Sequence, residues 1–271
     1  MDPGRFQKKI ISILLLLALA LALCACGETD TSPWRTIEVL GERRYALICR
    51  KDDRLAPLLT AAIESLARDG TLSAASRRWL GRDAITLKPQ PAAPTEEGED
   101  EAAAAQRTLI VGVERDFEPL AFWENGFLQG MSVDIADGLG RALGWEVAYQ
   151  PITANEVGTQ LSSGNIDVAL GFDPAAVNAE KYTLGPVYMT SEIVVAAPRE
   201  GGATRWKDLQ DERIGIVDDP IVTACLKSSE SAGRYAAAAV IYASPGRCLF
   251  ALENGWCAAL AMDRIMLERL L

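Results

Sequence analysis

The chain of 271 residues contains no histidine. Without an imidazole there is no Ser-His-Asp or Cys-His catalytic constellation and no histidine-ligated metal. The six cysteines include no CxxC pair, so a zinc ribbon or a thioredoxin-type site has no support. Basic residues are also few, because 27 Lys and Arg against 37 Asp and Glu give a net charge of −10. This balance disfavours nucleic acids and anionic membrane surfaces as main partners, and small solutes remain.

The longest apolar run lies at the N-terminus. Three basic residues precede an apolar stretch over 10–23, which is too short for a comfortable membrane span of ~20 residues and predicts a signal peptide over 1–25. The stretch ends in LCACG at 23–27, which resembles the lipobox of bacterial lipoproteins with Cys26 as the lipidated residue. An ordinary secretory signal or an uncleaved anchor is the alternative. We expect an exported protein held to the cell membrane by acyl chains.

The cysteines beyond residue 30 have two interpretations. Export would expose them to an oxidising compartment, where a disulfide among Cys225, Cys248 and Cys257 becomes possible. Each cysteine, including Cys49, also stands in an apolar segment, which favours a role as a small buried hydrophobic residue.

Composition changes sharply at residues 86–106, where proline, alanine and acidic residues dominate and predict a linker. Before the linker, apolar residues recur at helical spacing from Leu55 to Leu66. After it, strand and helix patterns alternate in two successive series, which predicts two α/β lobes. The predicted strands are 109–113, 147–149, 166–170, 193–197, 214–217, 240–242 and 258–262, and the predicted helices are 133–143, 157–162, 222–227 and 247–253.

Short motifs follow one another after the linker. They are LIVGVERDFEPLAF at 109–122, GMSVDIA at 130–136, LSSGNID at 161–167, GPVY at 185–188 and LENGWCAALAMD at 252–263. In this order and spacing they resemble the bacterial extracellular solute-binding proteins of family 3, the polar amino-acid-binding receptors of ABC importers. The resemblance implies a two-lobed α/β fold of the type II periplasmic-binding-protein kind, with a solute in the cleft between the lobes.

The order of the motifs departs from the family pattern. Family members normally finish with a hinge strand, a long helix and a Trp-Leu-Gly tail, and similar sequences, YALICRKDD at 45–53 and RWLG at 78–81, stand here before the first lobe. We expect a circular permutation, with a tandem of two truncated receptors as the alternative. The predicted domains are a first lobe of 51–85 plus 107–192 joined by linker 86–106, a second lobe of 27–44 plus 199–271, and hinge strands 45–50 and 193–198.

Three ligand contacts are implied by the resemblance. Phe117 lies where the family places an aromatic ring over the solute, Glu114 lies at a turn that often carries an acid, and Asp263 takes the place of the carboxylate that pairs with a ligand ammonium. The alternatives are core packing for Phe117, surface exposure for Glu114, and capping of the last helix for Asp263.

Two departures from the family affect the expected ligand. The arginine that binds the α-carboxylate is replaced by NAEK at 178–181, and Lys181 is a point charge rather than a bidentate group. The turn that cradles a carboxylate is replaced by Asp218, Asp219 and Pro220. Acids in the cleft favour a cationic ligand such as an amine, a basic amino acid or a short basic peptide, with helix capping by Asp218 and Asp219 as the alternative.

The sequence therefore predicts a lipid-anchored, extracytoplasmic and monomeric receptor that delivers a small polar solute to an ABC permease. The predicted ligand contacts are Glu114, Phe117, Lys181, Asp218 and Asp263, and no catalytic residue, metal or cofactor is expected. The first alternative is a membrane-tethered sensor or interaction protein with a degenerate cleft. A dehydratase-like enzyme on the same scaffold has less support, because the carboxylate-binding arginine is missing.

Overall fold

The computed structural model describes residues 32–88 and 107–270. The chain divides into two units, Met1–Pro33 and Trp34–Leu271, and the account below concerns the second. The predicted signal peptide at 1–25 and the predicted lipidation site at Cys26 lie outside the described residues. Among the helices within 32–88 and 107–270, none combines the length and apolar character needed to cross a bilayer.

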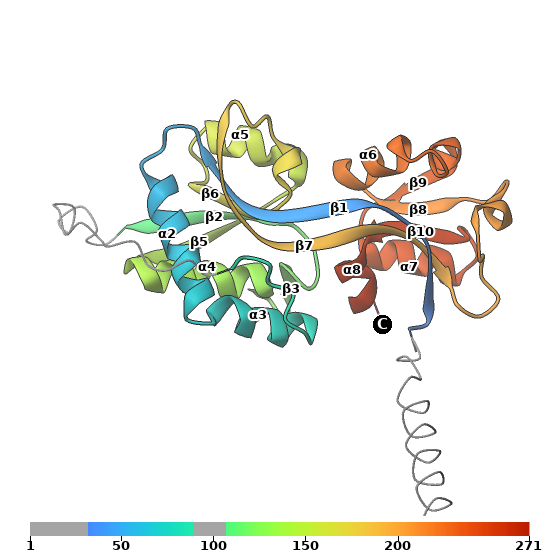
Figure 1. Cartoon of the computed structure of the whole chain (residues 1–271), viewed down its shortest axis with the longest axis horizontal. Coiled ribbons are helices and arrows are strands. Elements are labelled where there is room, and N and C mark those ends of the chain that lie inside the picture. Colours follow the sequence, from blue (N-terminus) through green and yellow to red (C-terminus); the bar gives the residue numbers. More distant parts are fainter. Residues whose placement is uncertain (1–31, 89–106, 271) are drawn as a thin grey trace, which may run out of the picture. The chain divides into compact units, whose positions relative to one another are not determined.

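One sheet of eight strands organises the second unit, with the strand order β5-β2-β6-β1-β7-β10-β8-β9 (Figure 1). Its two central strands are also the longest, at 17 residues each: β1 (Trp34–Arg50) and β7 (Tyr182–Pro198). The others are β2 (Thr108–Glu114), β5 (Glu146–Ile152), β6 (Val168–Phe172), β8 (Ile214–Val217), β9 (Ala239–Tyr242) and β10 (Ala259–Asp263), and β3 (Phe122–Glu124) pairs with β4 (Phe127–Gln129) in a separate hairpin.

Two parallel groups of strands flank β1 and β7. Strands β5, β2 and β6 run parallel in one half of the sheet, and β10, β8 and β9 run parallel in the other half. The two long strands join these halves, because β1 pairs antiparallel with β6, β7 pairs antiparallel with β10, and the two pair with each other. Parallel strands alternating with helices in two halves confirm the predicted two-lobed α/β fold.

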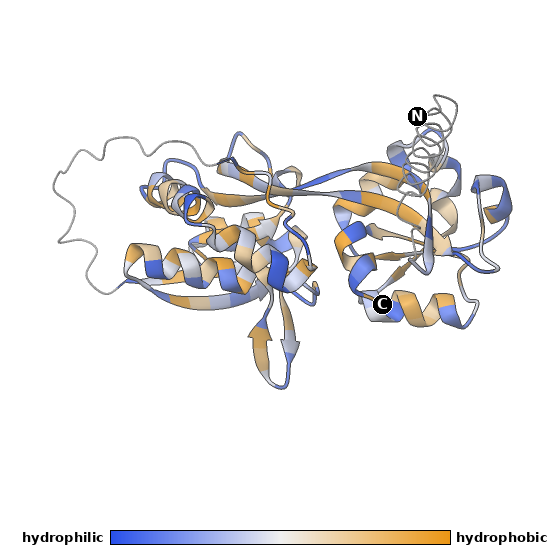
Figure 2. Ribbon diagram, turned by 60° about the horizontal axis from the view of Figure 1, so that its bottom comes forward, coloured by the Kyte–Doolittle hydropathy of each residue, from blue (hydrophilic) through white to orange (hydrophobic). Residues whose placement is uncertain are grey.

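Helices cover the sheet with their apolar faces. In α2 the buried residues recur at helical spacing from Leu55 to Leu66, as the sequence predicts. Figure 2 shows strands that are mostly hydrophobic within each half and helices that carry both hydrophobic and hydrophilic residues. The helices are α2 (Leu55–Arg68), α3 (Thr71–Leu80), α4 (Met131–Leu143), α5 (Val157–Ser162), α6 (Pro220–Ser228), α7 (Pro245–Glu253) and α8 (Arg264–Arg269), with short 3₁₀ turns at Ala154–Glu156, Pro174–Ala176, Trp206–Leu209 and Gly233–Ala238.

Helices α2 and α3 precede the predicted linker yet pack against α4, which follows it. The indole Nε1 of Trp79 in α3 donates a hydrogen bond of 2.8 Å to Asp134 in α4. The Trp79 ring also meets Phe122 edge to face, with 5.7 Å between centroids. In α2, Leu66 lies against Gly138 of α4 so closely that a Cβ added at Gly138 would stand 2.9 Å from the leucine Cδ1.

The predicted hinge strands, 45–50 and 193–198, lie on β1 and β7, the two strands that join the halves. On β1, residues 46–49 pair with β6 inside one half, and on β7, residues 193–196 pair with β10 inside the other. Between these pairings lie residues 42–44 of β1, opposite residues 190–192 of β7. The apolar runs mark the buried parts of each half, whereas the crossing stretch is polar and gives no apolar signal. The finer division into lobe segments stays a prediction.

The structure also describes the start of the predicted linker and the four cysteines beyond residue 30. The N–H groups of Thr86 and Leu87 donate to the carbonyl of Tyr188 at 2.9 and 3.3 Å, so the predicted linker 86–106 begins with residues bonded to β7, and residues 89–106 lie outside the description. All four cysteines of the described residues are free. Burial raises the pKa of Cys49 and of Cys248 to about 12, which agrees with their interpretation as buried hydrophobic residues.

Candidate ligand-binding site

The topology brings the carboxyl ends of parallel strands from both halves toward the middle of the sheet. Glu114 is the last residue of β2, and Asp263 is the last residue of β10. Asp219 follows β8 after one intervening residue and caps α6. In open α/β sheets ligands bind outside the carboxyl ends of the strands, so these three acids mark the place where a ligand is expected.

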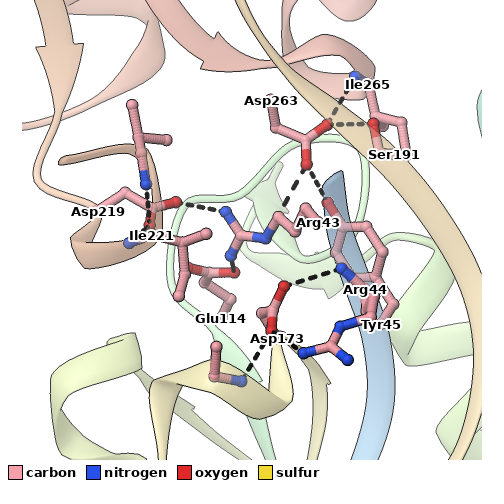
Figure 3. Close-up of polar contacts among 12 residues, drawn as sticks. Arg43, Arg44, Tyr45, Glu114, Asp173, Ser191, Asp219, Ile221, Asp263 and Ile265 are labelled. Carbon is pink, nitrogen blue, oxygen red and sulfur yellow. Dashed lines mark hydrogen bonds and ion pairs between the residues drawn. The ribbon is translucent and has the colours of Figure 1, made fainter. Parts of the chain in front are cut away.

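A basic residue of the chain stands between these acids. Arg43 lies on the crossing stretch of β1, and its side chain is completely buried. Its Nη2 lies 3.0 Å from Glu114 Oε2, its Nη1 forms an ion pair with Asp219, and its Nε lies 3.9 Å from Asp263 Oδ2. Figure 3 shows the guanidinium between the three carboxylates, which come from β2 in one half and from α6 and β10 in the other.

Aromatic rings complete the surroundings of the guanidinium. Its central carbon lies 4.9 Å from the centroid of the Phe117 ring and 5.5 Å from that of Tyr45. Both distances fall within the range of cation–π attraction. Arg43, Glu114, Phe117, Asp219 and Asp263 are called the Arg43 cluster below.

Asp263 and Asp219 are also held by hydrogen bonds from groups other than Arg43. Asp263 accepts hydrogen bonds from the hydroxyls of Tyr45 and Ser191, at 2.5 and 2.7 Å, and from the N–H of Ile265 at 2.8 Å. Asp219 Oδ1 accepts from the N–H of Ile221 at 2.8 Å, at the start of α6. These bonds fix both carboxylates in place. The second oxygen of Asp219, Oδ2, pairs with Arg43, whereas the Asp263 oxygen nearest to Arg43, Oδ2, is the one that accepts from Tyr45.

Burial sets the electrostatics of the cluster. Burial raises the pKa of Glu114 to about 7, while Arg43 pulls that pKa down and Asp219 and Asp263 push it up. Burial likewise raises the pKa of Asp263, against the opposing effect of Arg43. Burial alone would lower the pKa of Arg43, but Glu114 and Asp219 raise it well above its ordinary value. The cluster therefore has three acids around one permanent cation.

The stability of the protein is expected to fall as the pH rises through the titration of Glu114. Between about pH 4.5 and 7 the folded protein keeps a proton that an unfolded glutamate has released. Proton uptake on folding means that the free energy of unfolding decreases with pH, by up to about 3 kcal/mol for this shift. Urea unfolding at a series of pH values should show this slope in the wild type and a smaller one in Glu114→Gln. Equal slopes in the two proteins would contradict the raised pKa.

The structure brings three of the predicted contacts together, since Glu114, Phe117 and Asp263 all belong to the cluster. Asp263 also caps α8, so the two roles considered for it coexist. Asp218 and Lys181 are exposed, and it is the neighbouring Asp219 that both caps α6 and pairs with Arg43. The ligand roles of all five predicted residues stay predictions.

Sequence reasoning missed Arg43. The available signal was the period of two along a strand. Arg43 stands on the same face of β1 as Tyr45, Leu47 and Cys49, between two exposed residues, Glu42 and Arg44. A buried charge at that position needs partners on the facing elements, and three acids supply them.

A pocket of about 240 Å³ lies between the loop after β2, strand β3, the start of α7 and the later part of α8. An ion pair of 2.8 Å between Arg269 of α8 and Glu118 of that loop bridges the two halves here. The lining residues are Asp116, Glu118, Phe122 and Trp123 on one side and Ser244, Pro245, Gly246, Met266, Arg269 and Leu270 on the other. Within residues 32–88 and 107–270, no group of three or more Asp, Glu or Cys residues is placed to hold a metal ion.

Residues 109–242 match the family model described as bacterial extracellular solute-binding proteins, family 3. The arginine-binding extracellular protein ArtP of Bacillus subtilis is 25% identical over 114 residues, which cover 42% of this chain and 45% of ArtP. The L-cystine-binding protein TcyJ of Escherichia coli K12 is 30% identical over 115 residues, covering 40% of this chain and 42% of TcyJ. The match thus spans less than half the length of either relative.

Two solved structures show the same fold. A substrate-binding protein of an ABC uptake transporter from Streptococcus pneumoniae, with bound histidine, has a TM-score of 0.52 at 22% identity, covering 61% of this chain and 68% of the other. A solute receptor for L-cysteine from Neisseria gonorrhoeae has a TM-score of 0.50 at 23% identity, covering 61% and 67%. At this identity the likeness concerns the fold alone.

Proposed function

We propose that this chain, which belongs to the bacterial extracellular solute-binding proteins of family 3, is a receptor that holds a small polar solute between its two lobes. The observation that carries the proposal is that three acids from both halves, Glu114, Asp219 and Asp263, surround one cationic position. The guanidinium of Arg43 lies at that position, over the ring of Phe117. Contacts from both lobes to one ligand stabilise the state in which the lobes are together.

The chemistry of the cluster favours a solute with a cationic group. Three acids within a buried site repel an anion, and carboxylates fixed by hydrogen bonds match a guanidinium or ammonium group. The pocket of about 240 Å³ between the loop that carries Phe117 and helices α7 and α8 offers room for the rest of a solute of amino-acid size. A basic amino acid, an amine or a short basic peptide fits this description, and binding of this kind requires no catalytic step.

The proposal includes where the receptor acts in the cell and which partner takes its solute. The receptor is lipid-anchored through Cys26, acts outside the cytoplasm as a monomer, and delivers its solute to an ABC permease. The lipobox-like sequence at 23–27 and the family match support this assignment.

A circular permutation accounts for the order of the elements. The family-like ending at 45–81 precedes the family match at 109–242, yet its helices pack against α4 of the matched stretch through Trp79 and Asp134. This packing supports a permutation in which segments from both sides of residues 86–106 build one lobe.

A second candidate function is a tethered sensor or interaction protein whose cleft no longer takes a solute. The observation in its favour is that Arg43, a residue of the chain itself, occupies the position between the three acids.

A thermal-shift screen of amino acids, polyamines and small peptides tests the receptor function. A solute at a hundredfold excess over its Kd should stabilise the folded protein by roughly 2.7 kcal/mol. Asp219→Asn should weaken binding of that solute at least about tenfold, because a buried charge pair is lost, whereas Asp218→Asn, at the exposed neighbouring position, should weaken it less. A screen in which no solute shifts the transition would contradict the receptor and favour the sensor.

A further inference from the structure

Arg43 has the chemistry expected of a bound solute. Its guanidinium is the same group that a free arginine or agmatine carries. It pairs with Glu114 of one half and Asp219 of the other, and it lies 4.9 Å from the centroid of the Phe117 ring. Only 1% of the side chain is exposed, so a second cation has no room between the acids while Arg43 is in place.

The fit of Arg43 is incomplete at one point. Its Nε is buried without a hydrogen-bond partner among the described residues, and the nearest acid oxygen, Asp263 Oδ2, lies 3.9 Å away. A buried donor without a partner costs free energy. Asp263 is meanwhile held by Tyr45, Ser191 and Ile265, so it does not move to meet the arginine. A side chain tied to β1 cannot optimise all three contacts, whereas a free molecule can adjust its position.

We infer that Arg43 is a tethered occupant of the cation-binding position in the cleft, and that a free guanidinium or ammonium compound binds there only by displacing it. The inference rests on the proposed function in taking the Arg43 cluster as the solute position. Arg43 thereby helps to set the affinity for the solute. The apparent affinity of any cationic solute is its intrinsic affinity multiplied by the fraction of molecules in which Arg43 has left the acids.

Calorimetric titration of arginine, agmatine and citrulline into the wild type and Arg43→Ala tests this inference. Arginine and agmatine should bind Arg43→Ala at least about tenfold more tightly than the wild type, because the competing side chain is gone. Citrulline, which has the length of arginine but an uncharged urea group, should gain nothing. Arg44→Ala is the matched control: Arg44 is the next residue on β1, its side chain is 49% exposed, and its removal should leave all affinities unchanged.

Removal of Arg43 leaves three acids without their cation, and the resulting repulsion could prevent folding. A second variant with less buried charge is therefore measured as well. Arg43→Ala with Glu114→Gln keeps Asp219 and Asp263 for a ligand and has one buried charge fewer. In whichever variant folds, arginine should raise the unfolding temperature more than in the wild type, and citrulline should not. If arginine stabilises neither variant more than the wild type, or if citrulline does so equally, the inference is overturned.

The outcomes separate this inference from the receptor function. Binding of agmatine to Arg43→Ala, with no solute binding to the wild type, supports the tethered occupant and contradicts the receptor. A solute that binds the wild type and Arg43→Ala with equal affinity supports the receptor and overturns the inference.

Discussion

Arg43→Ala lowers the free energy of unfolding by about 3–5 kcal/mol, because it leaves buried acids without the cation that compensates them. Glu114, Asp219 and Asp263 all face the guanidinium, and Asp263 is almost completely buried. The substitution also removes the apolar part of a fully buried side chain beside Phe117. For a domain of this size the unfolding temperature should drop by roughly 10 °C.

Urea unfolding measured at pH 8, where Glu114 is ionised in the folded protein, gives the clearest comparison. Arg44→Ala serves as the control, because the Arg44 side chain is half exposed and its ion pair with Asp173 is long, at 3.8 Å. That variant should lose less than about 1 kcal/mol. Equal losses in the two variants would show that Arg43 does not hold the acids together.

Gly130→Ala is expected to destabilise the protein by roughly 3 kcal/mol or more, through backbone strain and a direct clash. Gly130 has a φ of +132°, in a region that residues with a side chain rarely adopt. A Cβ there would stand 2.3 Å from the carbonyl oxygen of Leu120. Neighbouring bonds hold this contact close, because the N–H groups of Met131 and Ser132 donate to the carbonyls of Pro119 and Leu120 at 3.0 and 2.8 Å.

The same bonds position the loop that carries Phe117 under Arg43, so Gly130→Ala should also weaken any ligand that contacts the ring. Gly144→Ala is the matched control at the other end of α4. Its φ is +69°, but a Cβ there meets nothing within 4 Å, so the loss should stay near 1 kcal/mol. Thermal unfolding of both variants measures the difference. A Gly130→Ala protein as stable as Gly144→Ala would contradict the close packing of this loop.

The fold could be predicted from the sequence where the spacing of apolar residues matches the repeat of a helix or a strand. The apolar stripe from Leu55 to Leu66 predicted α2, and the alternation of strands and helices predicted the two α/β lobes. Apolar runs give no signal for the stretch between the halves, because residues 42–44 of β1 are polar. The spacing of apolar residues indicates which side chains are buried within a lobe, and it says little about where β1 and β7 cross from one lobe to the other.

The site followed from the sequence only in part. Glu114, Phe117 and Asp263 were predicted from family-like motifs. Each of them lies at or just after the end of a strand, where ligands bind in α/β sheets, and a short stretch of sequence is enough to show such a position. Arg43 was missed because its surroundings come from β2, α6 and β10, at separations that no local pattern encodes. The sequence analysis named Asp218 and not Asp219 as a ligand contact, because only the cap geometry of α6 shows which carboxylate faces the cluster.

A crystal structure of the protein prepared without added amino acids or amines would test the central claim most directly. The expected result is electron density for the Arg43 guanidinium between Glu114 and Asp219, lying over the ring of Phe117. An Arg43 side chain directed to solvent, with the space between the three acids empty, would contradict the claim.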